Sequence, residues 1–427
     1  MNTDSYLPFG ITPAIVRQGE AALARAAGRF NSIRQMREKN QLKVLQALQS
    51  AGLSESQLGG TTGYGYNDLG REQIERAYAQ AFGAEAALVR IQISSGTQAL
   101  ALCLFGLLRP GDELLVVTGK PYDSLAATLG ISDVPGGHKT GSLGEFGVRY
   151  REVQLLADGR PDLAAIAGSL TAQTRVVYVQ KSRGYSSRPS LLAADIAAIR
   201  SVLNERRHSA VLFVDNCYGE FVEAVEPCAV GADLCAGSLI KNPGAGISPS
   251  GAYICGKAEL VEQAANRLTA PGIGSHVGPS LGFNRQIALG FYQAPHIVAE
   301  SLMGAVFAAE LFSATGYRCL PAADSARGDI VQTIEFGSPE PLVAFCQAIQ
   351  AASPVDAYVL PEPGEMPGYD CDVIMASGSF TSGSSIELSA DGPLRPPYLA
   401  FLQGGLNFDT TRLGCLLALQ RLTDKQL

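Results

Sequence analysis

The sequence is poor in charge and has no run of basic residues. Only 17% of its 427 residues are charged, and the formal net charge is −7 at pH 7. Proteins that bind a nucleic-acid backbone usually present clustered lysine and arginine. The composition therefore argues against a nucleic-acid partner, while the 46% of hydrophobic residues is enough for a large buried core.

Long hydrophobic runs are also missing. The longest apolar stretch, ALALCLFGLL at 99–108, is far shorter than the roughly 20 residues that cross a membrane. The N-terminal residues MNTDSYLPFG contain neither the cationic segment nor the apolar segment of a secretory signal. We therefore expect a cytoplasmic protein with no membrane partner.

No C-x-x-C pair is present among the nine cysteines. Their number is odd, and several lie inside apolar runs, among them Cys103, Cys217, Cys235 and Cys255. This pattern indicates reduced cysteines of the core rather than disulfides or zinc ligands, so we expect no metal.

Helical and strand patterns alternate along most of the chain. Apolar or β-branched runs at 113–117, 175–180, 210–215 and 251–255 are separated by helical segments, which is typical of βαβ units. We expect an α/β fold with a mostly parallel sheet in a large domain at 58–297. A helical arm at 1–57 precedes it, and a smaller α+β domain at 298–427 follows.

Two charged residues stand next to predicted strands. Asp215 closes the strand LFVD, where a carboxylate can cap a helix, form a salt bridge or pair with a protonated ring nitrogen of a cofactor. Lys241 lies in GSLIKNPGAG, between an apolar run and a glycine-rich turn. Desolvation lowers the pKa of a lysine, and a neutral amine can attack an aldehyde, although a lysine can also reach water along its own stem.

Two further segments fit a bound ligand. SSGTQAL at 94–100 opens a helix, and its backbone N–H groups with the hydroxyls of Ser95 and Thr97 can form a phosphate cradle or a plain N-cap. Tyr122 follows a strand, where it either stacks on a planar ligand or packs in the core. The order of cradle, aromatic ring, aspartate and lysine matches the parts that a pyridoxal phosphate site needs.

The sequence resembles the fold-type I pyridoxal-phosphate enzymes of the cystathionine and methionine γ-lyase clan. It is most similar to the branch called aluminium-resistance or methionine γ-lyase family proteins. The motifs that carry this resemblance cover most of the chain, and they include SSGTQALALCLFGLLRPGDELL, VQKSRGYSSRPSL, VDNCYGEF and GSLIKNPGAGISPSGAYI.

The resemblance implies roles for individual residues. Lys241 would form the Schiff base with the cofactor, Asp215 would pair with its ring nitrogen, and Tyr122 would stack on its ring. The phosphate would be bound by the backbone of Gly96 and Thr97, with help from Ser95 and Ser238.

The sequence departs from the clan in several places. In the clan a tyrosine and an arginine reach the phosphate from a neighbouring subunit, whereas YGY here supplies Tyr64 and Tyr66. Ile240 replaces the hydroxyl residue that usually precedes the lysine. Arg183 stands where the clan has an asparagine that contacts the ring, so it is expected at the cofactor or the substrate. The arginine for the substrate carboxylate is expected late in the chain, where Arg395 is the first candidate and Arg412 the second.

The resemblance implies a carbon–sulfur lyase that eliminates a thiol from a sulfur-containing amino acid. Lys241 would act as the base, with Lys241 or a tyrosine such as Tyr66 as the acid. An aminotransferase uses the same parts, and a non-catalytic cofactor-binding stress-response protein is a third alternative. The clan also implies a homodimer or homotetramer with shared active sites.

Overall fold

The computed structural model describes residues 3–131, 140–366 and 371–426. Its main layer is a seven-stranded sheet in the order β1-β7-β6-β5-β4-β2-β3. The strands are β1 (Ala86–Arg90), β2 (Glu113–Val116), β3 (Arg149–Glu152), β4 (Thr174–Gln180), β5 (Val211–Asp215), β6 (Leu234–Ser238) and β7 (Ala252–Gly256). The pairs from β3 through β6 are parallel, and β7 is antiparallel to both β6 and β1. The expected mostly parallel α/β sheet is confirmed.

Helices cover both faces of this sheet. They are α2 (Leu69–Phe82), α3 (Gly96–Leu107), α4 (Asp123–Leu129), α5 (Leu163–Ser169), α6 (Ala193–Glu205) and α7 (Ala258–Leu268). Adjacent residues of β4 alternate between two separate cores, with Val176 and Tyr178 in one and Val177 and Val179 in the other. This double burial explains why the strands read as continuous apolar runs in the sequence.

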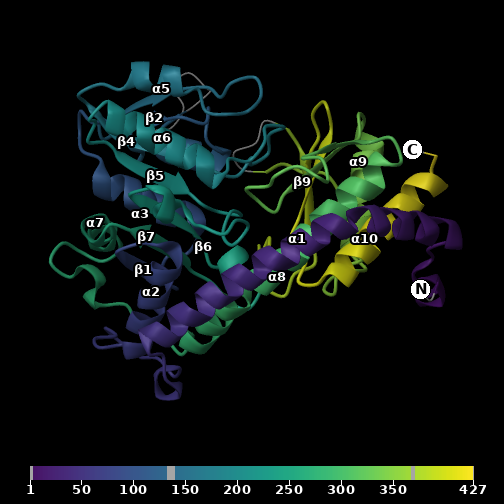
Figure 1. The fold of residues 1–427 in the computed structure, drawn as a ribbon, viewed down its shortest axis with the longest axis horizontal. Helices are drawn as coiled ribbons and strands as arrows, with labels where there is room; N and C mark the ends of the chain where they lie inside the picture. Colours follow the sequence, from purple (N-terminus) through teal and green to yellow (C-terminus); the bar gives the residue numbers. More distant parts are fainter. Residues whose placement is uncertain (1–2, 132–139, 367–370, 427) are drawn as a thin grey trace.

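A second sheet of five antiparallel strands follows in the order β10-β11-β12-β9-β8. It consists of β8 (Arg318–Leu320), β9 (Gln332–Glu335), β10 (Val373–Ser377), β11 (Ser389–Pro393) and β12 (Leu399–Gln403), with α9 (Pro339–Ala351) and α10 (Phe408–Asp424). Figure 1 shows this layer beside the large sheet, near the C-terminus.

Two long helices connect the two layers. α1 (Pro13–Ala51) lies along α8 (Asn284–Ser313), and both run from the large sheet to the small one (Figure 1). α8 is long and apolar enough to cross a membrane, but 72% of its most apolar window is buried inside the protein, as in a core helix. The domain boundary expected at 297/298 falls inside this continuous helix.

The carboxyl ends of the parallel strands meet at one edge of the large sheet. β4 ends at Gln180, β5 at Asp215 and β6 at Ser238. Open α/β sheets bind their ligands at this edge, and here the small sheet stands next to it. The nine cysteines are free thiols, as expected.

Candidate active site

A cavity of about 650 Å³ lies at the carboxyl edge of the large sheet. Its wall contains nine of the residues that the sequence singles out, drawn from segments more than 290 residues apart. These are Ser95, Gly96, Thr97, Tyr122, Arg183, Asp215, Ser238, Lys241 and Arg395. The fold therefore brings the expected cradle, aromatic ring, carboxylate and amine into one site.

Asp215 is buried at the end of β5. Its Oδ1 accepts a hydrogen bond from the backbone N–H of Cys217 at 3.1 Å, and its Oδ2 accepts one from the Tyr178 hydroxyl at 3.3 Å. Burial raises the pKa of Asp215, while the nearby charge of Lys241 and these hydrogen bonds lower it in part. A cation held against this carboxylate would be strongly favoured, because burial leaves little water to solvate the charge.

Lys241 follows β6 in a tight turn. A Cβ at Gly244 would collide with the carbonyl oxygen of Leu239, so the turn that carries the lysine needs a glycine. The Nζ of Lys241 lies 4.0 Å from the centre of the Tyr218 ring, close enough for a cation–π interaction.

The protonation state of Lys241 differs from the one expected. Burial by itself lowers the pKa of Lys241, but surrounding acidic groups outweigh it and raise the pKa above its usual range; these groups are Cys217, Tyr218, Asp215 and Tyr122. The expectation that desolvation keeps the amine neutral is therefore wrong for the protein by itself. Without a ligand, the groups around Lys241 therefore favour its protonated form.

The start of α3 forms one end of the cavity. Ser95 is the N-cap, and its hydroxyl accepts a hydrogen bond from the backbone N–H of Gln98 at 3.1 Å. The N–H groups at Gly96 and Thr97 have no intrahelical acceptor, because they lie in the first turn. A Cβ at Gly96 would approach the sulfur of Cys217 to 3.2 Å, so a side chain there would crowd the cradle.

Tyr122 and Ser238 complete this end. The Tyr122 hydroxyl lies 3.1 Å from Oγ1 of Thr97, and the backbone N–H of Tyr122 donates to the side chain of Gln180 at 3.0 Å. Burial raises the pKa of Tyr122, so its hydroxyl stays protonated at neutral pH. Ser238 is buried at the end of β6 and accepts a hydrogen bond from Ile240 N–H at 3.3 Å.

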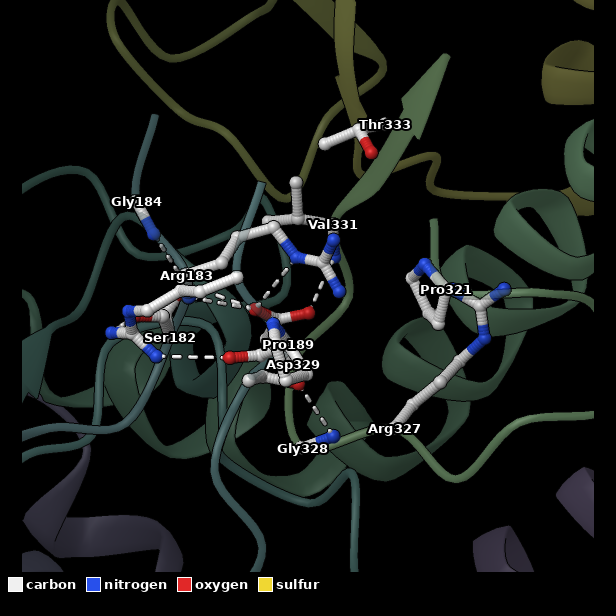
Figure 2. A network of polar contacts seen from close by, with 12 residues as sticks. Ser182, Arg183, Gly184, Pro189, Pro321, Arg327, Gly328, Asp329, Val331 and Thr333 are labelled. Carbon is white, nitrogen blue, oxygen red and sulfur yellow. Dashed lines mark hydrogen bonds and ion pairs between the residues drawn. The ribbon is translucent and has the colours of Figure 1, made fainter. Parts of the chain in front are cut away.

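Arg183 belongs to the loop that follows β4. Its guanidinium donates to the carbonyl oxygen of Leu320 at 2.9 Å, and its Nε lies 3.7 Å from Oδ2 of Asp329. Asp329 also accepts hydrogen bonds from the Ser182 hydroxyl and from Arg183 N–H, both at 3.1 Å (Figure 2). These contacts connect the loop after β4 to the small layer. The expected contact of Arg183 with a ligand stays a prediction.

The two arginine candidates for a substrate carboxylate lie in different places. Arg395 is exposed in the turn between β11 and β12 and lines the cavity, so its role stays a prediction. Arg412 is buried in α10, where it pairs with Glu20 at 2.6 Å and lies outside the cavity wall. The prediction of Arg412 as a carboxylate-binding residue is therefore wrong, because its guanidinium already forms an ion pair between α10 and α1.

Tyr64 and Tyr66 lie outside the cavity of their own chain. They are 74% and 60% exposed, and their ring centres are 5.6 Å apart. Their loop is held rigidly, because Arg71 donates to the carbonyl of Gly65 at 2.9 Å and Gly278 N–H donates to that of Tyr64. Two exposed aromatic side chains on an anchored loop are suited to contact a second protein chain.

Several cavity residues were missed by the reasoning from sequence. Gln180 ends β4 just as Asp215 ends β5, and this polar residue at a strand end is a signal that could have identified it. Arg188 donates to the carbonyl oxygens of Gln180, Pro189 and Ser182. Tyr185 and Gln403 also line the wall, and no local pattern links them.

These residues fit pyridoxal phosphate. A helix N-terminus with hydroxyl groups matches a phosphate, an aromatic ring beside it matches a planar ring, and a buried carboxylate matches a protonated ring nitrogen. A side chain at position 96 would be crowded, so the glycine there leaves room for a compact ligand. The raised pKa of Lys241, near Asp215, agrees with an anionic one. Among the described residues, no group of three or more His, Cys, Asp or Glu side chains is placed to hold a metal ion.

Comparison with known proteins supports this interpretation. The sequence model of the family "Methionine gamma-lyase" matches residues 15–423. The Bacillus subtilis protein YnbB is 48% identical over 404 residues, covering 95% of each chain. L-methionine gamma-lyase of Pseudomonas putida is 33% identical over 169 residues, 39% of this chain and 36% of that one.

Solved structures agree with the sequence relatives. A carbon-sulfur lyase involved in aluminium resistance from Clostridium novyi NT superimposes with a TM-score of 0.94 at 42% identity, covering 98% of each chain. The pyridoxal-5'-phosphate-dependent protein YhfS of Escherichia coli superimposes with a TM-score of 0.60 at 18% identity, over 92% of this chain and 97% of that one, which shows the shared fold. The family model and the near-complete coverage show that this chain belongs to the methionine gamma-lyase family.

Proposed function

We propose that the protein is a pyridoxal-phosphate-dependent carbon–sulfur lyase that acts on a sulfur-containing amino acid by β- or γ-elimination. The observation that carries this proposal is the placement of Lys241, Asp215 and the start of α3 around one cavity. Family membership and the carbon-sulfur lyase of Clostridium novyi support the reaction class.

Each residue would hold one part of the cofactor. The N–H groups of Gly96 and Thr97 would bind the phosphate, Tyr122 would pack on the ring, and Lys241 would bind the aldehyde carbon. When bound, pyridoxal phosphate supplies an electron sink that makes the substrate Cα acidic. Asp215 would pair with a protonated ring nitrogen. This pairing would offset the negative charge of Asp215, which otherwise raises the pKa of Lys241.

The side chains then account for the proton movements. The amine of Lys241 is the base that takes the proton from the substrate Cα, and it can return a proton to the departing sulfur. Tyr122 keeps its proton at neutral pH and orients toward Thr97, so it serves as a packing and hydrogen-bonding group. Arg395 is the proposed partner of the substrate carboxylate, because it reaches the cavity from the small layer.

A second copy of the chain is part of the proposal. The exposed pair Tyr64 and Tyr66 would enter the cavity of a neighbouring subunit and complete its phosphate site. The anchored loop and the absence of both rings from their own cavity wall support this arrangement.

The test is product analysis with the purified protein and added cofactor. We expect a free thiol, ammonia and a keto acid from at least one of L-methionine, L-homocysteine, L-cystathionine and S-methyl-L-cysteine, and none from Lys241→Ala. A keto acid without thiol or ammonia would identify an aminotransferase instead. No product from any sulfur amino acid, with the cofactor bound, would contradict the proposal.

A further inference from the structure

Tyr218 places the face of its ring against the amine of Lys241. It follows Asp215, the last residue of β5, in the next turn of the chain and belongs to the cavity wall. The Nζ of Lys241 lies 4.0 Å from the ring centre, inside the distance of about 6 Å at which an ammonium group is attracted to an aromatic face. The nitrogen that would react in the proposed lyase therefore has an aromatic ring as a direct neighbour.

The backbone holds this ring in place. Tyr218 has a φ of 69°, in the left-handed region that bulky residues rarely adopt, and residues held in such conformations cluster at functional sites. Nδ2 of Asn242, the neighbour of Lys241 in the chain, donates to the carbonyl oxygen of Glu220 at 3.0 Å. This hydrogen bond joins the turn that carries Tyr218 to the turn that carries Lys241, so the spacing of the two side chains is restrained.

The small layer also restrains the ring. Tyr218 packs against an apolar cluster of Val331, Leu399 and Phe401. Val331 and Phe401 line the cavity as well. Backbone and packing together limit the movement of the phenol, so its face stays available to the amine of Lys241.

Other groups act on Lys241 through charges that change. Those that interact with it electrostatically are Tyr122, Asp215, Cys217 and Glu220, and the other cations of the cavity wall are Lys120, Arg183, Arg188 and Arg395. Burial raises the pKa of Tyr122 and of Cys217, and that of Glu220 to about 8, so the protonated form of each is favoured at neutral pH. In the proposed function, the charge of Asp215 would be offset by the ring nitrogen. These contributions to the proton affinity of Lys241 therefore depend on pH and on the ligand.

The aromatic face acts independently of both. Its partial negative charge comes from the quadrupole of the ring and needs no ionised group. The contact favours the ammonium form over the neutral amine, because only the ammonium form carries the charge that the ring attracts. In the proposed function a substrate amine displaces Lys241, and the released side chain can make this same contact.

We propose that Tyr218 is a further catalytic residue: the face of its ring holds the proton on the released amine of Lys241 and so sets the pH range over which that amine works. This inference rests on the proposed lyase function and deepens it. The proton that Lys241 takes from the substrate Cα forms a new N–H bond, and this bond breaks when Lys241 gives the proton to the departing sulfur. Tyr218 touches the nitrogen throughout and exchanges no proton itself.

The first measurement uses the full chain freed of cofactor. Cyanate carbamoylates only the neutral form of an amine, so mass spectrometry after cyanate treatment reports how firmly Lys241 holds its proton. The exposed Lys39 of α1 is the internal reference. Tyr218→Leu removes the ring and should raise the rate at Lys241 about 2- to 30-fold at neutral pH, the effect expected for the loss of one cation–π contact. Tyr218→Phe keeps the face and should react like the unmodified protein.

A graded series separates the ring face from simple access of the reagent. Phenylalanine that carries one, two or three fluorine atoms is incorporated at position 218, because fluorine weakens the negative ring face and changes the size of the ring little. The rate at Lys241 should rise with each fluorine. The control places trifluorophenylalanine at the exposed Phe146, outside the cavity wall, and should leave the rate unchanged. A flat series, or equal rates in Tyr218→Leu and Tyr218→Phe, overturns the inference.

The second measurement is the pH profile of kcat for thiol release by the loaded protein, because kcat reports ionisations in the substrate complex. Loss of the contact lowers the pKa of Lys241. The limb of the profile that Lys241 governs should therefore move to lower pH by about 0.3 to 1.5 units in Tyr218→Leu and stay in place in Tyr218→Phe. A lower kcat with an unshifted profile would assign Tyr218 a structural role and overturn the inference.

The two measurements keep this inference apart from the proposed function. If the unmodified protein releases no thiol, the proposed function fails, whereas the cyanate rates still decide whether the ring holds the proton on Lys241. If thiol is released and Tyr218→Leu keeps both the cyanate rate and the pH profile of the unmodified protein, the lyase function stands and the inference is overturned.

Discussion

Replacing Asp329 with alanine should destabilise the protein and loosen the loop that forms one side of the cavity. Asp329 precedes β9 and is fully buried. Its carboxylate accepts from the Ser182 hydroxyl and Arg183 N–H at 3.1 Å and from Val331 N–H at 3.2 Å, and it lies 3.7 Å from Nε of Arg183 (Figure 2). This single side chain therefore ties the loop after β4 to the small layer.

The expected loss is large because Arg183 stays behind. Arg183 is 2% exposed, so Asp329→Ala leaves a buried cation without its carboxylate partner. Removing one partner of a buried ion pair typically costs about 3–5 kcal/mol. The loop also carries Tyr185 and Arg188 on the cavity wall, so we expect weaker substrate binding as well as lower stability.

Urea denaturation of the holoprotein measures the free energy of unfolding, and steady-state kinetics measures KM. The matched control is Asp324→Ala, which removes an exposed carboxylate five residues away and should change stability by less than about 0.5 kcal/mol. Equal stabilities of Asp329→Ala and Asp324→Ala, with unchanged KM, would refute the proposed link between the two layers.

Two other predictions follow from buried backbone and carboxylate contacts. Hydrogen bonds from Ser280, Thr61 and neighbouring groups overcome the effect of burial and lower the pKa of Asp68, so its stabilisation is present above the ordinary pKa near 4 and is lost as pH falls. Asp68→Asn should therefore cost about 1–3 kcal/mol in urea denaturation at pH 7 and progressively less as the pH falls below about 4, and an equal cost at pH 7 and at about pH 2 would contradict this. Gly96→Ala should weaken cofactor binding about tenfold in a fluorescence titration, because the added methyl crowds the phosphate cradle. Its control, Gly28→Ala in α1, meets no neighbour and should bind cofactor normally; equal affinity of the two variants would refute the cradle.

The parts of the site that depend on local sequence patterns could be predicted from the sequence. Asp215 was recognised because it closes an apolar strand, and Lys241 because a lone cation stood between an apolar run and a glycine-rich turn. Both follow strands of one sheet, so their meeting at its edge was predictable once the alternation of strands and helices was seen.

The remainder depends on contacts between distant segments. Asp391 and Tyr185 are 206 residues apart, and only the packing of the small sheet against the large one brings them together. The state of Lys241 was mispredicted for the same reason, because its pKa depends on acidic groups from two other segments, 215–218 and Tyr122. In the sequence, Arg412 is an arginine late in the chain, as expected for a residue that binds the substrate carboxylate. Its ion pair with Glu20 of α1 could be recognised only in the folded structure.

The most direct test of the account asks which side chain binds the cofactor aldehyde. The purified protein would be supplied with pyridoxal phosphate, reduced with borohydride, digested and analysed by mass spectrometry. The account predicts a stable phosphopyridoxyl adduct on Lys241 in nearly every molecule, and its loss in Lys241→Ala. Unmodified Lys241 under saturating cofactor, or an adduct on Lys181 or Lys120 instead, would contradict it.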